Sequence, residues 1–414
     1  MKKYIVIFIN FLILISCQNP EEIKSNSSDT LFKLLDNSES GIDFTNTVIN
    51  QKDFNIFKYR NYYNGGGVAI GDINNDSLPD IYFTSNTGNN KLYLNNGDLE
   101  FIDISSKAGV EGDKPWSTGV VMVDINHDGF LDIYVSNAGN MEGDNHDNDL
   151  YINNGDLTFT ESAENYNIAK TGFTTHSSFF DYDKDGDLDL YILNNSNIPV
   201  TSLGYSEQRD LRAQDWKNVP KIFRGVGDML LRNDNGRFID VSEKAGIYGS
   251  LIGFGLGVMT SDINMDGYPD IYVSNDFYER DYLYINNQDG TFTEQIQNWT
   301  SHLSLSAMGV DIADINNDGL VDIFVTDMLP EEDSRVKSVM EFEGYNVFKL
   351  KQSKGFYQQY IQNTLQLNNG NNTFSEIAYL SGVAATDWSW AGLIFDMDND
   401  GFRDIFVTNG IAHD

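Results

Sequence analysis

The chain has 414 residues, of which 40% are hydrophobic and 13% aromatic, and it carries 62 acidic residues against 27 Lys and Arg, a formal net charge of −35. This apolar content is sufficient for a folded globular core. The charge argues against nucleic acid as a partner, because a phosphate backbone would be repelled, and it makes cations the partners that the chain attracts.

The N-terminal residues have the pattern of an export signal. Two lysines precede an apolar run at residues 4–15, which is short for a permanent membrane span. The residues that end at Cys17 are similar to the lipobox of bacterial lipoproteins. We therefore interpret residues 1–17 as a lipoprotein signal peptide with lipidation at Cys17, and the polar residues 18–30 as a linker. An ordinary signal peptide with an incidental cysteine is the alternative.

This interpretation predicts an exported protein at the outer membrane or the cell surface, attached to the membrane through the lipid anchor only. Cys17 is the only cysteine, so no disulfide can form within one chain. An exported protein without disulfides depends on a large core or on bound metal for its stability.

Six segments share one nine-residue pattern, and we number them loops 1 to 6. Asp or Asn occupies positions 1, 3 and 5, and Asp occupies position 9. Position 6 is Gly in loops 2 to 6 and Ser77 in loop 1, and glycine suits a turn that needs a positive φ. The side chains at positions 1, 3, 5 and 9 are Asp72, Asn74, Asp76 and Asp80; Asp124, Asn126, Asp128 and Asp132; Asp181, Asp183, Asp185 and Asp189; Asp262, Asn264, Asp266 and Asp270; Asp314, Asn316, Asp318 and Asp322; and Asp396, Asp398, Asp400 and Asp404.

Alternate oxygen-bearing residues around a tight turn can converge on one cation, and several carboxylates with a backbone carbonyl are typical ligands of calcium. Without a cation, two carboxylates about 4 Å apart repel each other by roughly 4 kcal/mol at an effective dielectric constant near 20. One such loop could be a solvated acidic turn, but six copies in register favour bound Ca2+.

An EF-hand begins with the same spacing but requires a glutamate at position 12 and a helix after it. Position 12 is apolar in all six loops, and the residues from position 9 onward are rich in β-branched and aromatic side chains. The loops are therefore predicted to be hairpin turns between strands. The run before each loop is rich in small residues, which predicts a crowded inner strand.

Two further strand signals joined by an Asn-Gly type of turn follow most loops, as in KLYLNNGDLEFIDIS. Repeats of four strands predict an all-β protein with the four-stranded blades of a β-propeller. The sixth repeat contains only its first two strands, and residues 31–44 match the outermost strands of other repeats. We expect this segment to add an outer strand to the last blade. Six blades with one incomplete, and seven blades in a longer protein, both remain open.

The hairpins behind small-residue strands resemble the FG-GAP or VCBS repeats of integrin α-chain propellers, over about residues 31–414. The stretches YNGGGVAIGDINND, TDMLPEED and NTLQLNNG are similar to exported bacterial VCBS-repeat proteins related to cartilage acidic protein. The resemblance implies that the position 7 carbonyl also binds calcium. It belongs to Leu78, Phe130, Asp187, Tyr268, Leu320 and Phe402. Ser77 departs from the family pattern, so we expect loop 1 to be the weakest site.

Two insertions, at about residues 194–227 and 328–362, are predicted to carry the ligand-binding function, because loops on a rigid scaffold bind partners. The second is expected to contain a helix opened by Pro330. A carbohydrate-binding surface requires exposed aromatic side chains with amide and carboxylate neighbours, and the candidates are Tyr205, Trp216, Tyr345 and Tyr357. The alternative is that these side chains anchor the insertions to the blades.

Signals of an enzyme are few, and no catalytic residue is assigned. His127 is expected to be a solvated turn residue. His176 occupies an inner-strand position where the other repeats have Gly or Ala, and it is predicted to face a central channel with Trp116, Asp387, Trp388 and Trp390.

The predicted function is that of a calcium-stabilised surface lipoprotein that binds a glycan or a protein. A polysaccharide-degrading propeller enzyme, either a lyase or a hydrolase, is the alternative, and a structural role in a larger surface complex is a third.

Overall fold

The structure is a computed structural model that describes residues 31–52, 54–139, 146–196, 209–212, 225–340 and 343–410. The chain divides into two compact units, Met1–Asp36 and Asn37–Asp414. The described residues of the first unit, 31–36, belong to no helix or strand. All helices and strands described below lie in the second unit.

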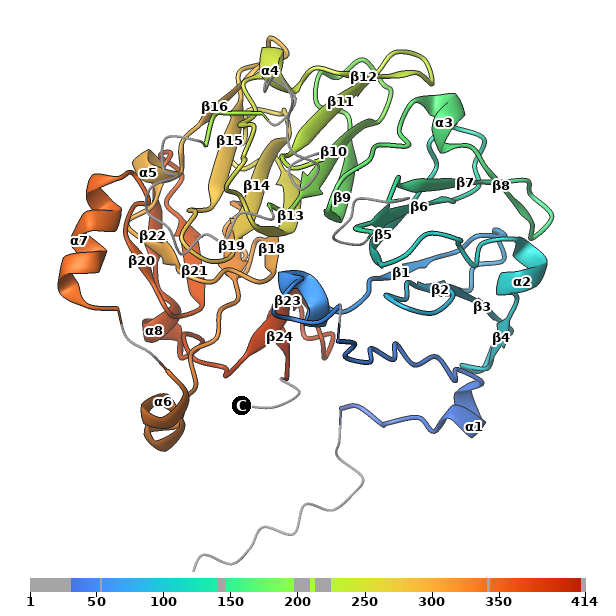
Figure 1. Cartoon of the computed structure of the whole chain (residues 1–414), viewed down its shortest axis with the longest axis horizontal. Coiled ribbons are helices and arrows are strands. Elements are labelled where there is room, and N and C mark those ends of the chain that lie inside the picture. The colour runs from blue at the N-terminus through green and yellow to red at the C-terminus, as the bar shows by residue number, and fades with distance from the viewer. Residues whose placement is uncertain are drawn as a thin grey trace, which may run out of the picture. The chain divides into compact units, whose positions relative to one another are not determined.

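Five four-stranded antiparallel sheets form most of the second unit (Figure 1). Within each sheet the four strands lie side by side in chain order, and only in the fifth does another strand, β20, come between two of them in the sequence. A sixth sheet has two strands within the described residues. The strands of the first three sheets are β1 (Val68–Gly71), β2 (Asp80–Phe83), β3 (Lys91–Asn95) and β4 (Phe101–Asp103); β5 (Ser117–Val123), β6 (Asp132–Asn137), β7 (Asp149–Asn153) and β8 (Phe159–Glu161); and β9 (Thr174–Phe180), β10 (Asp189–Asn194), β11 (Met229–Asn233) and β12 (Phe238–Asp240). Those of the last three are β13 (Gly255–Ser261), β14 (Asp270–Asn275), β15 (Tyr282–Asn286) and β16 (Phe292–Glu294); β18 (Val310–Ala313), β19 (Asp322–Val325), β21 (Thr364–Asn368) and β22 (Phe374–Glu376); and β23 (Ser389–Phe395) and β24 (Asp404–Asn409).

Each acidic loop connects the first and second strands of its sheet, as predicted. The aspartate at position 9 opens the second strand and pairs with the last residue of the first strand, as Asp132 does with Val123. The same register holds in all six sheets. The side chain at position 2 is buried in loops 1 to 4, at Ile73, Ile125, Tyr182 and Ile263.

The first strands are rich in glycine because neighbouring sheets approach each other closely there. A Cβ atom at Gly67 would lie 2.6 Å from the Thr118 carbonyl oxygen of the next sheet, and one at Gly309 would lie 2.5 Å from the Trp390 carbonyl oxygen. A larger residue at either position would force these strands apart. The small-residue runs therefore have the role that the sequence predicted for them.

The apolar core is divided among the interfaces between consecutive sheets. Tyr82 and Tyr151 belong to the cluster shared by the first and second sheets, and Phe324 and Ile394 to the cluster shared by the fifth and sixth. The remaining three interfaces are filled in the same way. The second to fifth sheets are thus each stabilised by burial against two neighbours, whereas these clusters join the first and the sixth sheet to one neighbour each.

In five sheets a four-residue helix follows the fourth strand. These helices are α2 (Ser105–Ala108), α3 (Ala163–Tyr166), α4 (Ser242–Ala245), α5 (Ile296–Trp299) and α8 (Ala378–Ser381). A residue in the left-handed region ends four of them, such as Gly246 after α4, because it lets the chain turn back and satisfies the last carbonyls. The short 3-10 helix η1 (Arg60–Tyr63) precedes β1.

The helix α1 (Asn37–Ser40) repeats this helix end next to the first sheet. Gly41 has a φ of 74°, and a side chain there would collide with the Phe101 carbonyl of β4, just as one at Gly246 would meet the Phe292 carbonyl of β16. The α1 segment therefore has the place of the helix that ends a preceding sheet. Residues 31–36 belong to no strand, so the outer strand predicted within residues 31–44 is not formed. The regular structure in this segment is the helix α1.

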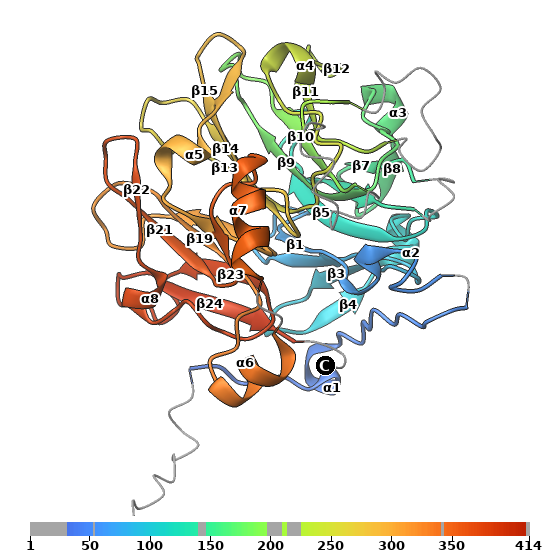
Figure 2. The ribbon, with the colours of Figure 1, turned by 60° about the vertical axis from the view of Figure 1, so that its left-hand side comes forward.

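The second insertion contains two helices, α6 (Asp333–Val339) and α7 (Tyr345–Ser353), and the strand β20 (Gln359–Tyr360), which pairs in parallel with β17 (Leu303–Ser304). The predicted helix therefore exists, but α6 begins at Asp333 after the extended residue Glu332 and not at Pro330. Figure 2 shows α7 in front of the sheets, where Lys351 lies 4.4 Å from the Tyr278 ring centroid.

Candidate functional site

All six acidic loops have the same backbone geometry, with left-handed residues at positions 4 and 6. In loop 2 these residues are His127, at a φ of 58°, and Gly129, at 89°. His127 is exposed, in agreement with its predicted role as a solvated turn residue. Ser77 in loop 1 has a φ of 71°, so this loop keeps the turn geometry although the glycine is missing. A non-glycine residue in this region costs about 1 kcal/mol.

Backbone amides hold the carboxylates at positions 1 and 5. In loop 2, the Asp128 N–H donates to Asp124 Oδ1 (3.1 Å) and the Gly129 N–H donates to Asp124 Oδ2 (2.9 Å). The Phe130 N–H then donates to Asp128 Oδ1 (2.9 Å). The same three bonds recur in the other five loops. In loop 2 each of these three oxygens accepts one backbone N–H and retains a second lone pair, which can bind a metal ion.

Position 3 divides the loops into two kinds. Where it is Asn, its amide donates to the position 5 carboxylate, as Asn126 Nδ2 does to Asp128 Oδ2 at 2.9 Å, and this bond is present in four loops. Loops 3 and 6 have Asp instead. Their carboxylates cannot donate to one another, so these loops concentrate negative charge.

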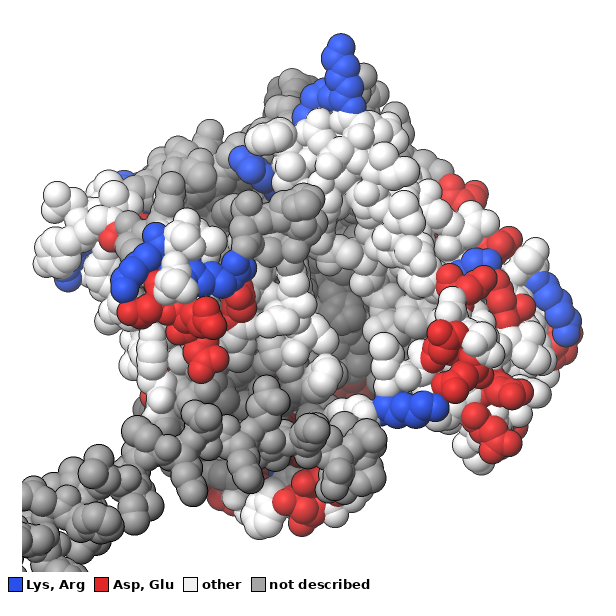
Figure 3. All heavy atoms as spheres, turned by 90° about the horizontal axis from the view of Figure 1, so that it is seen from below, with Lys and Arg blue, Asp and Glu red and all other residues white. Residues whose placement is uncertain are grey.

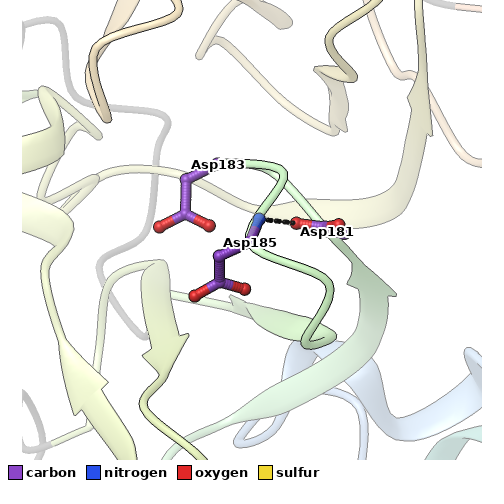
Figure 4. A group of neighbouring side chains, drawn as sticks. All are labelled: Asp181, Asp183 and Asp185. Carbon is purple, nitrogen blue, oxygen red and sulfur yellow. Dashed lines mark hydrogen bonds between the residues drawn. The ribbon is translucent and has the colours of Figure 1, made fainter.

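Loop 3 shows this concentration most clearly. Carboxylate oxygens of Asp181, Asp183 and Asp185 lie within 4.8 Å of one another, and Figure 4 shows the three side chains gathered at the turn. Asp183 Oδ1 is buried and has no hydrogen-bond partner among the described residues, and burial together with the Asp185 charge raises the pKa of Asp183. A buried carboxylate oxygen that lacks a donor and has acidic neighbours fits a divalent cation.

A second group of this kind lies in loop 6, where carboxylate oxygens of Asp396, Asp398 and Asp404 are within 4.8 Å of one another. In both loops the donor set consists only of hard oxygen atoms, which suits calcium. The residues of the loops therefore fit the cation that the sequence predicted. Binding by the position 7 carbonyls, and the ligand sets of all six loops, stay predictions.

The aspartate at position 9 is fully buried in loops 1 to 5 and connects the loop to the third strand. In loop 2, the Ile125 N–H donates to Asp132 Oδ2 (3.1 Å), and the Asn153 N–H donates to Asp132 Oδ1 (2.8 Å). Burial, reinforced by the other loop carboxylates, raises the pKa of Asp132 to about 6 and those of Asp189 and Asp270 to about 7. This aspartate therefore has a structural role in addition to its predicted role as a ligand.

The partner of this aspartate is the asparagine that ends each third strand, and this pairing was not predicted from the sequence. Its backbone N–H donates to the position 9 carboxylate at 2.8 Å in all five complete sheets. Its side chain also bridges neighbouring sheets, since Asn368 Nδ2 donates to the Ile263 carbonyl (3.0 Å) and the Val321 carbonyl (3.2 Å). An asparagine ends each of the LYxN-like runs, and this recurrence in the sequence could have revealed the pairing.

The first strands of all six sheets line one cavity of about 550 Å³. His176 and Trp390 belong to its lining, as predicted. His176 Nδ1 has no hydrogen-bond partner among the described residues, and burial lowers the pKa of this histidine. A Cβ atom at Gly119 would lie 2.6 Å from His176 Nδ1, so the glycine leaves room for the imidazole ring.

The other predicted channel residues lie elsewhere, because tertiary packing places them outside the cavity. Trp116 is buried in a separate cluster with Tyr59 and Tyr62. Asp387 forms an ion pair with Arg335 of α6 and lines a different pocket. Trp388 is not among the residues that line the central cavity. The predicted constellation of one histidine, one acid and three tryptophans is therefore wrong.

Described residues of both insertions contact each other. Arg209 of the first insertion forms an ion pair with Glu279 and donates from Nη2 to the Gly355 carbonyl (3.3 Å) of the second. Its guanidinium carbon lies 5.8 Å from the ring centroid of Phe356. Tyr357, next in the chain, donates to the Thr300 carbonyl (2.7 Å), so this tyrosine anchors the insertion.

Tyr345, in contrast, is exposed at the rim of a pocket of about 540 Å³, which we call the tyrosine pocket. Its lining consists of Leu305, Leu329, Glu343, Tyr345, Phe348, Gln359, Tyr360, Ile361, Gln362 and Tyr379. Tyr345, Tyr360 and Tyr379 are 72%, 42% and 66% exposed. The pocket thus combines exposed aromatic rings with amides and one carboxylate, which is the combination expected of a carbohydrate-binding surface. Tyr205 and Trp216 lie outside the described residues.

Charge is distributed unevenly over the surface. Figure 3 shows acidic side chains gathered in patches that uncharged surface separates.

Cys17 lies outside the described residues, so its predicted lipidation is not tested. Within the residues that the structure describes, no helix has the length and apolar character needed to cross a bilayer.

Comparison with known proteins assigns the repeats. A family described as FG-GAP-like repeat matches residues 48–135, 138–192 and 262–325, together half of the chain. Cartilage acidic protein 1 of Xenopus tropicalis is 34% identical over 137 residues, which are 32% of this chain and 20% of that protein. The Homo sapiens protein of the same name is 29% identical over 218 residues, 52% of this chain and 28% of that protein. The matched region thus spans less than a third of these relatives.

Two solved structures have a similar but distant fold. One is an Agrocybe aegerita lectin described for specific recognition of non-reducing terminal N-acetylglucosamine, with a TM-score of 0.42 and 17% identity over 82% of this chain and 73% of the lectin. The other is the V. cholerae biofilm matrix protein Bap1, with a TM-score of 0.37 and 11% identity over 78% and 40%. These identities and TM-scores are too low for a ligand of either protein to be assigned to this chain. The matched repeats, together with the six acidic hairpins, show that the chain belongs to the FG-GAP-like repeat family.

Proposed function

We propose that residues 37–414 form a calcium-loaded β-propeller that acts as a binding module. The observation that carries the calcium assignment is the buried Asp183 Oδ1, which has Asp181 and Asp185 as neighbours and no hydrogen-bond partner in the part of the chain that the structure describes. Bound calcium would neutralise these carboxylates and replace the missing donor. The other five loops have the same backbone geometry, so the proposal extends to their oxygen atoms at positions 1, 3, 5, 7 and 9.

A metal-counting experiment tests this assignment. Equilibrium dialysis against millimolar Ca2+ should leave several ions bound per chain, and Asp183→Ala should bind one ion fewer. Asp156→Ala, which changes an exposed aspartate outside the loops, is the matched control and should bind as many ions as the unaltered chain. Equal binding by Asp183→Ala, or no bound calcium at all, would contradict the proposal.

The proposed ligand is a glycan, and the proposed place is the tyrosine pocket. Tyrosine rings stack on the apolar faces of sugar rings, while amides bind hydroxyl groups. Gln362 is buried and lines the pocket, so its side chain is positioned before a ligand arrives. Phe348 stacks on Tyr360 with ring centroids 5.7 Å apart, which supports one wall of the pocket. A protein ligand at the same surface remains the other candidate.

Screening against a polysaccharide panel tests the binding function. Tyr379→Ala should weaken retention of a bound polysaccharide at least tenfold, because this exposed ring leaves no core cavity when it is removed. Tyr63→Ala, at another exposed tyrosine outside the pocket, should retain binding. Retention without change of the polysaccharide is the expected result. New reducing or unsaturated ends that accumulate with time would support the polysaccharide-degrading alternative instead.

The proposed location is the bacterial cell surface, with a lipid on Cys17. Metabolic labelling with a radioactive fatty acid should label the chain, and Cys17→Ser should abolish the label and release the protein from membranes. Membrane attachment that survives Cys17→Ser would contradict the lipid anchor.

A further inference from the structure

We propose that Asp327 is a positioning residue of the tyrosine pocket, and that the loss of its negative charge in acid loosens the pocket and weakens ligand binding there. The ligand part of this proposal rests on the proposed glycan-binding function. Asp327 lies two residues after β19 and is fully buried. Its carboxylate accepts hydrogen bonds from two separate segments, which contribute Leu305 and Gln362 to the lining of the pocket.

Asparagine occupies the position of Asp327 in other sheets. Five residues after the position 9 aspartate, the second, third and fourth sheets have Asn137, Asn194 and Asn275. Each of these asparagines donates from Nδ2, at 2.8–3.0 Å, to the carbonyl of the residue two before the third strand of its sheet. In the fifth sheet the residue at that place is Gln362, and its N–H donates to Asp327 Oδ2 (3.2 Å). The hydrogen bond runs in the opposite direction, so this position needs an acceptor.

The same carboxylate oxygen also holds the chain that leaves β17. The Ser304 hydroxyl (2.6 Å), the Leu305 N–H (3.1 Å) and the Ser306 N–H (3.2 Å) all donate to Asp327 Oδ2. The Leu305 N–H also donates to the carbonyl of Tyr360 (3.0 Å), which forms one wall of the pocket. One oxygen atom therefore ties together the two segments between which the pocket lies.

Protonation of Asp327 would place a donor where only donors converge. The other oxygen, Oδ1, accepts the Met328 N–H (2.6 Å), so all the hydrogen bonds that the described residues form with this carboxylate come from donors. A proton on either oxygen would displace at least one of them. Burial raises the pKa of Asp327 to about 6. The ionised form is therefore present above about pH 6 and is lost as the pH falls through that value.

Other titratable groups lie near this carboxylate. Burial, together with the charge of Asp327, raises the pKa values of Asp276 and Asp281 beside the fourth sheet to about 7. On the side of the pocket, His302 Nε2 lies 3.3 Å from Gln362 Nε2 and 3.2 Å from a carboxylate oxygen of Glu376. The test therefore needs variants that separate the titration of Asp327 from that of these neighbours.

Amide resonances of the free chain test the positioning role without a ligand. In millimolar Ca2+, the amide protons of Leu305 and Gln362 should shift together, with a midpoint near pH 6. Asp327→Asn should remove this common titration, because the amide side chain does not ionise, whereas Asp281→Asn and His302→Gln should keep it. Resonances that do not move between pH 5 and pH 7.5, or that titrate equally in Asp327→Asn, would refute the positioning role.

Calorimetric titration with cellohexaose and N-acetylchitohexaose tests the effect on the ligand. Both probes are neutral, because an acidic chain repels an anionic glycan. The affinity of the unaltered chain should be about tenfold lower at pH 5 than at pH 7.5, since about one chain in eleven then has an ionised Asp327. Asp327→Asn should bind at least tenfold more weakly at pH 7.5, and its affinity should not change with pH.

The outcomes separate this proposal from the proposed function. Affinity of the unaltered chain that does not change with pH, or a pH dependence that Asp327→Asn retains, would overturn the proposal. Absence of binding at every pH would instead count against the proposed function for these glycans, and the amide resonances would then decide the role of Asp327.

Ser304→Ala keeps the test decisive if circular dichroism shows that Asp327→Asn does not fold. This variant removes one donor to the ionised carboxylate, so the midpoint of the amide titration should move to higher pH. The midpoint for sugar binding should move with it. An unchanged midpoint would overturn the proposal.

Discussion

Asp281 provides a sharp test of how buried charge affects this fold. It directly precedes the third strand of the fourth sheet, at the position where the first, second and fifth sheets have Asn90, Asn148 and Asn363. Asp281 is fully buried, accepts the Asn275 N–H at Oδ1 (2.8 Å) and accepts the Tyr272 hydroxyl at Oδ2 (2.7 Å).

Burial raises the pKa of Asp281 to about 7, and Asp327 and Glu279 act in the same direction because they are also acidic. The carboxyl group in the unfolded chain has a pKa of about 3.9, so the difference is about three units, or about 4 kcal/mol. The folded state holds this proton more tightly, so stability is lost as the pH rises from about 4 to about 7 and the full loss is present above that range.

Asp281→Asn removes this pH-dependent loss but introduces a smaller cost. The Asn148 amide donates to the Tyr134 hydroxyl (2.9 Å), which in turn donates to the Ile168 carbonyl (3.3 Å). Tyr272 donates to Asp281 instead, and an asparagine there would leave its hydroxyl without an acceptor, at a cost of about 1–2 kcal/mol. About 4 kcal/mol of the loss is present at pH 8 but only about 1.5 kcal/mol at pH 5. We therefore expect a gain of about 2–3 kcal/mol in the free energy of unfolding at pH 8 and almost no change at pH 5.

Urea unfolding at the two pH values, in millimolar Ca2+, measures these differences. Taking the difference between variant and unaltered chain cancels the titration of all other groups. Asn148→Asp is the reciprocal control and should destabilise the chain more at pH 8 than at pH 5. If the difference between Asp281→Asn and the unaltered chain does not change with pH, the reasoning about the buried carboxyl group is refuted.

Three further predictions concern the loops and the sheets. Chelation of calcium should lower the melting temperature, because a site contributes about 2.7 kcal/mol when the free calcium concentration is 100 times its Kd. Magnesium should restore little of the loss. Equal melting temperatures with and without calcium in scanning calorimetry would contradict a stabilising role. Ser77→Gly should raise the free energy of unfolding by about 1 kcal/mol, because glycine adopts the left-handed conformation of this residue without steric cost, and Gly129→Ser should lower it. Urea titration measures both changes. A decrease in the free energy of unfolding for Ser77→Gly would show that Ser77 does not strain loop 1. Asn368→Ala should cost about 2–3 kcal/mol because the buried Ile263 carbonyl and the partly buried Val321 carbonyl lose their donor. A cost as small as that of Asn371→Ala, at an exposed residue, would contradict this bridging role.

The loops could be predicted from the sequence because their parts are close together in the chain. Asp181, Asp183 and Asp185 occupy alternate positions of one turn, so spacing alone brings their carboxylates together. The connection of each loop to a following strand was also predictable, because the strand begins at position 9. Even Ser77, which departs from the pattern, did not change the turn, since its neighbours form the same bonds as in the other loops.

Contacts between distant segments were less predictable. Trp116, Asp387 and Trp388 were expected beside His176, but packing against Tyr59 and pairing with Arg335 place two of them elsewhere. The pairing of Asp132 with Asn153 was missed because it depends on the third strand lying against the second, which no spacing within the loop specifies.

The repeated pattern by itself therefore determined the hairpins, the acidic turns and the family, because each depends on residues within one turn or one pair of strands. Only the tertiary structure decided which side chains line the central cavity, where the two insertions meet at Arg209 and Gly355, and which edge of the sixth sheet lacks a neighbour among the described residues. These features depend on how separate sheets pack against each other. That packing is set by burial and shape over the whole unit, and no local run of residues contains it.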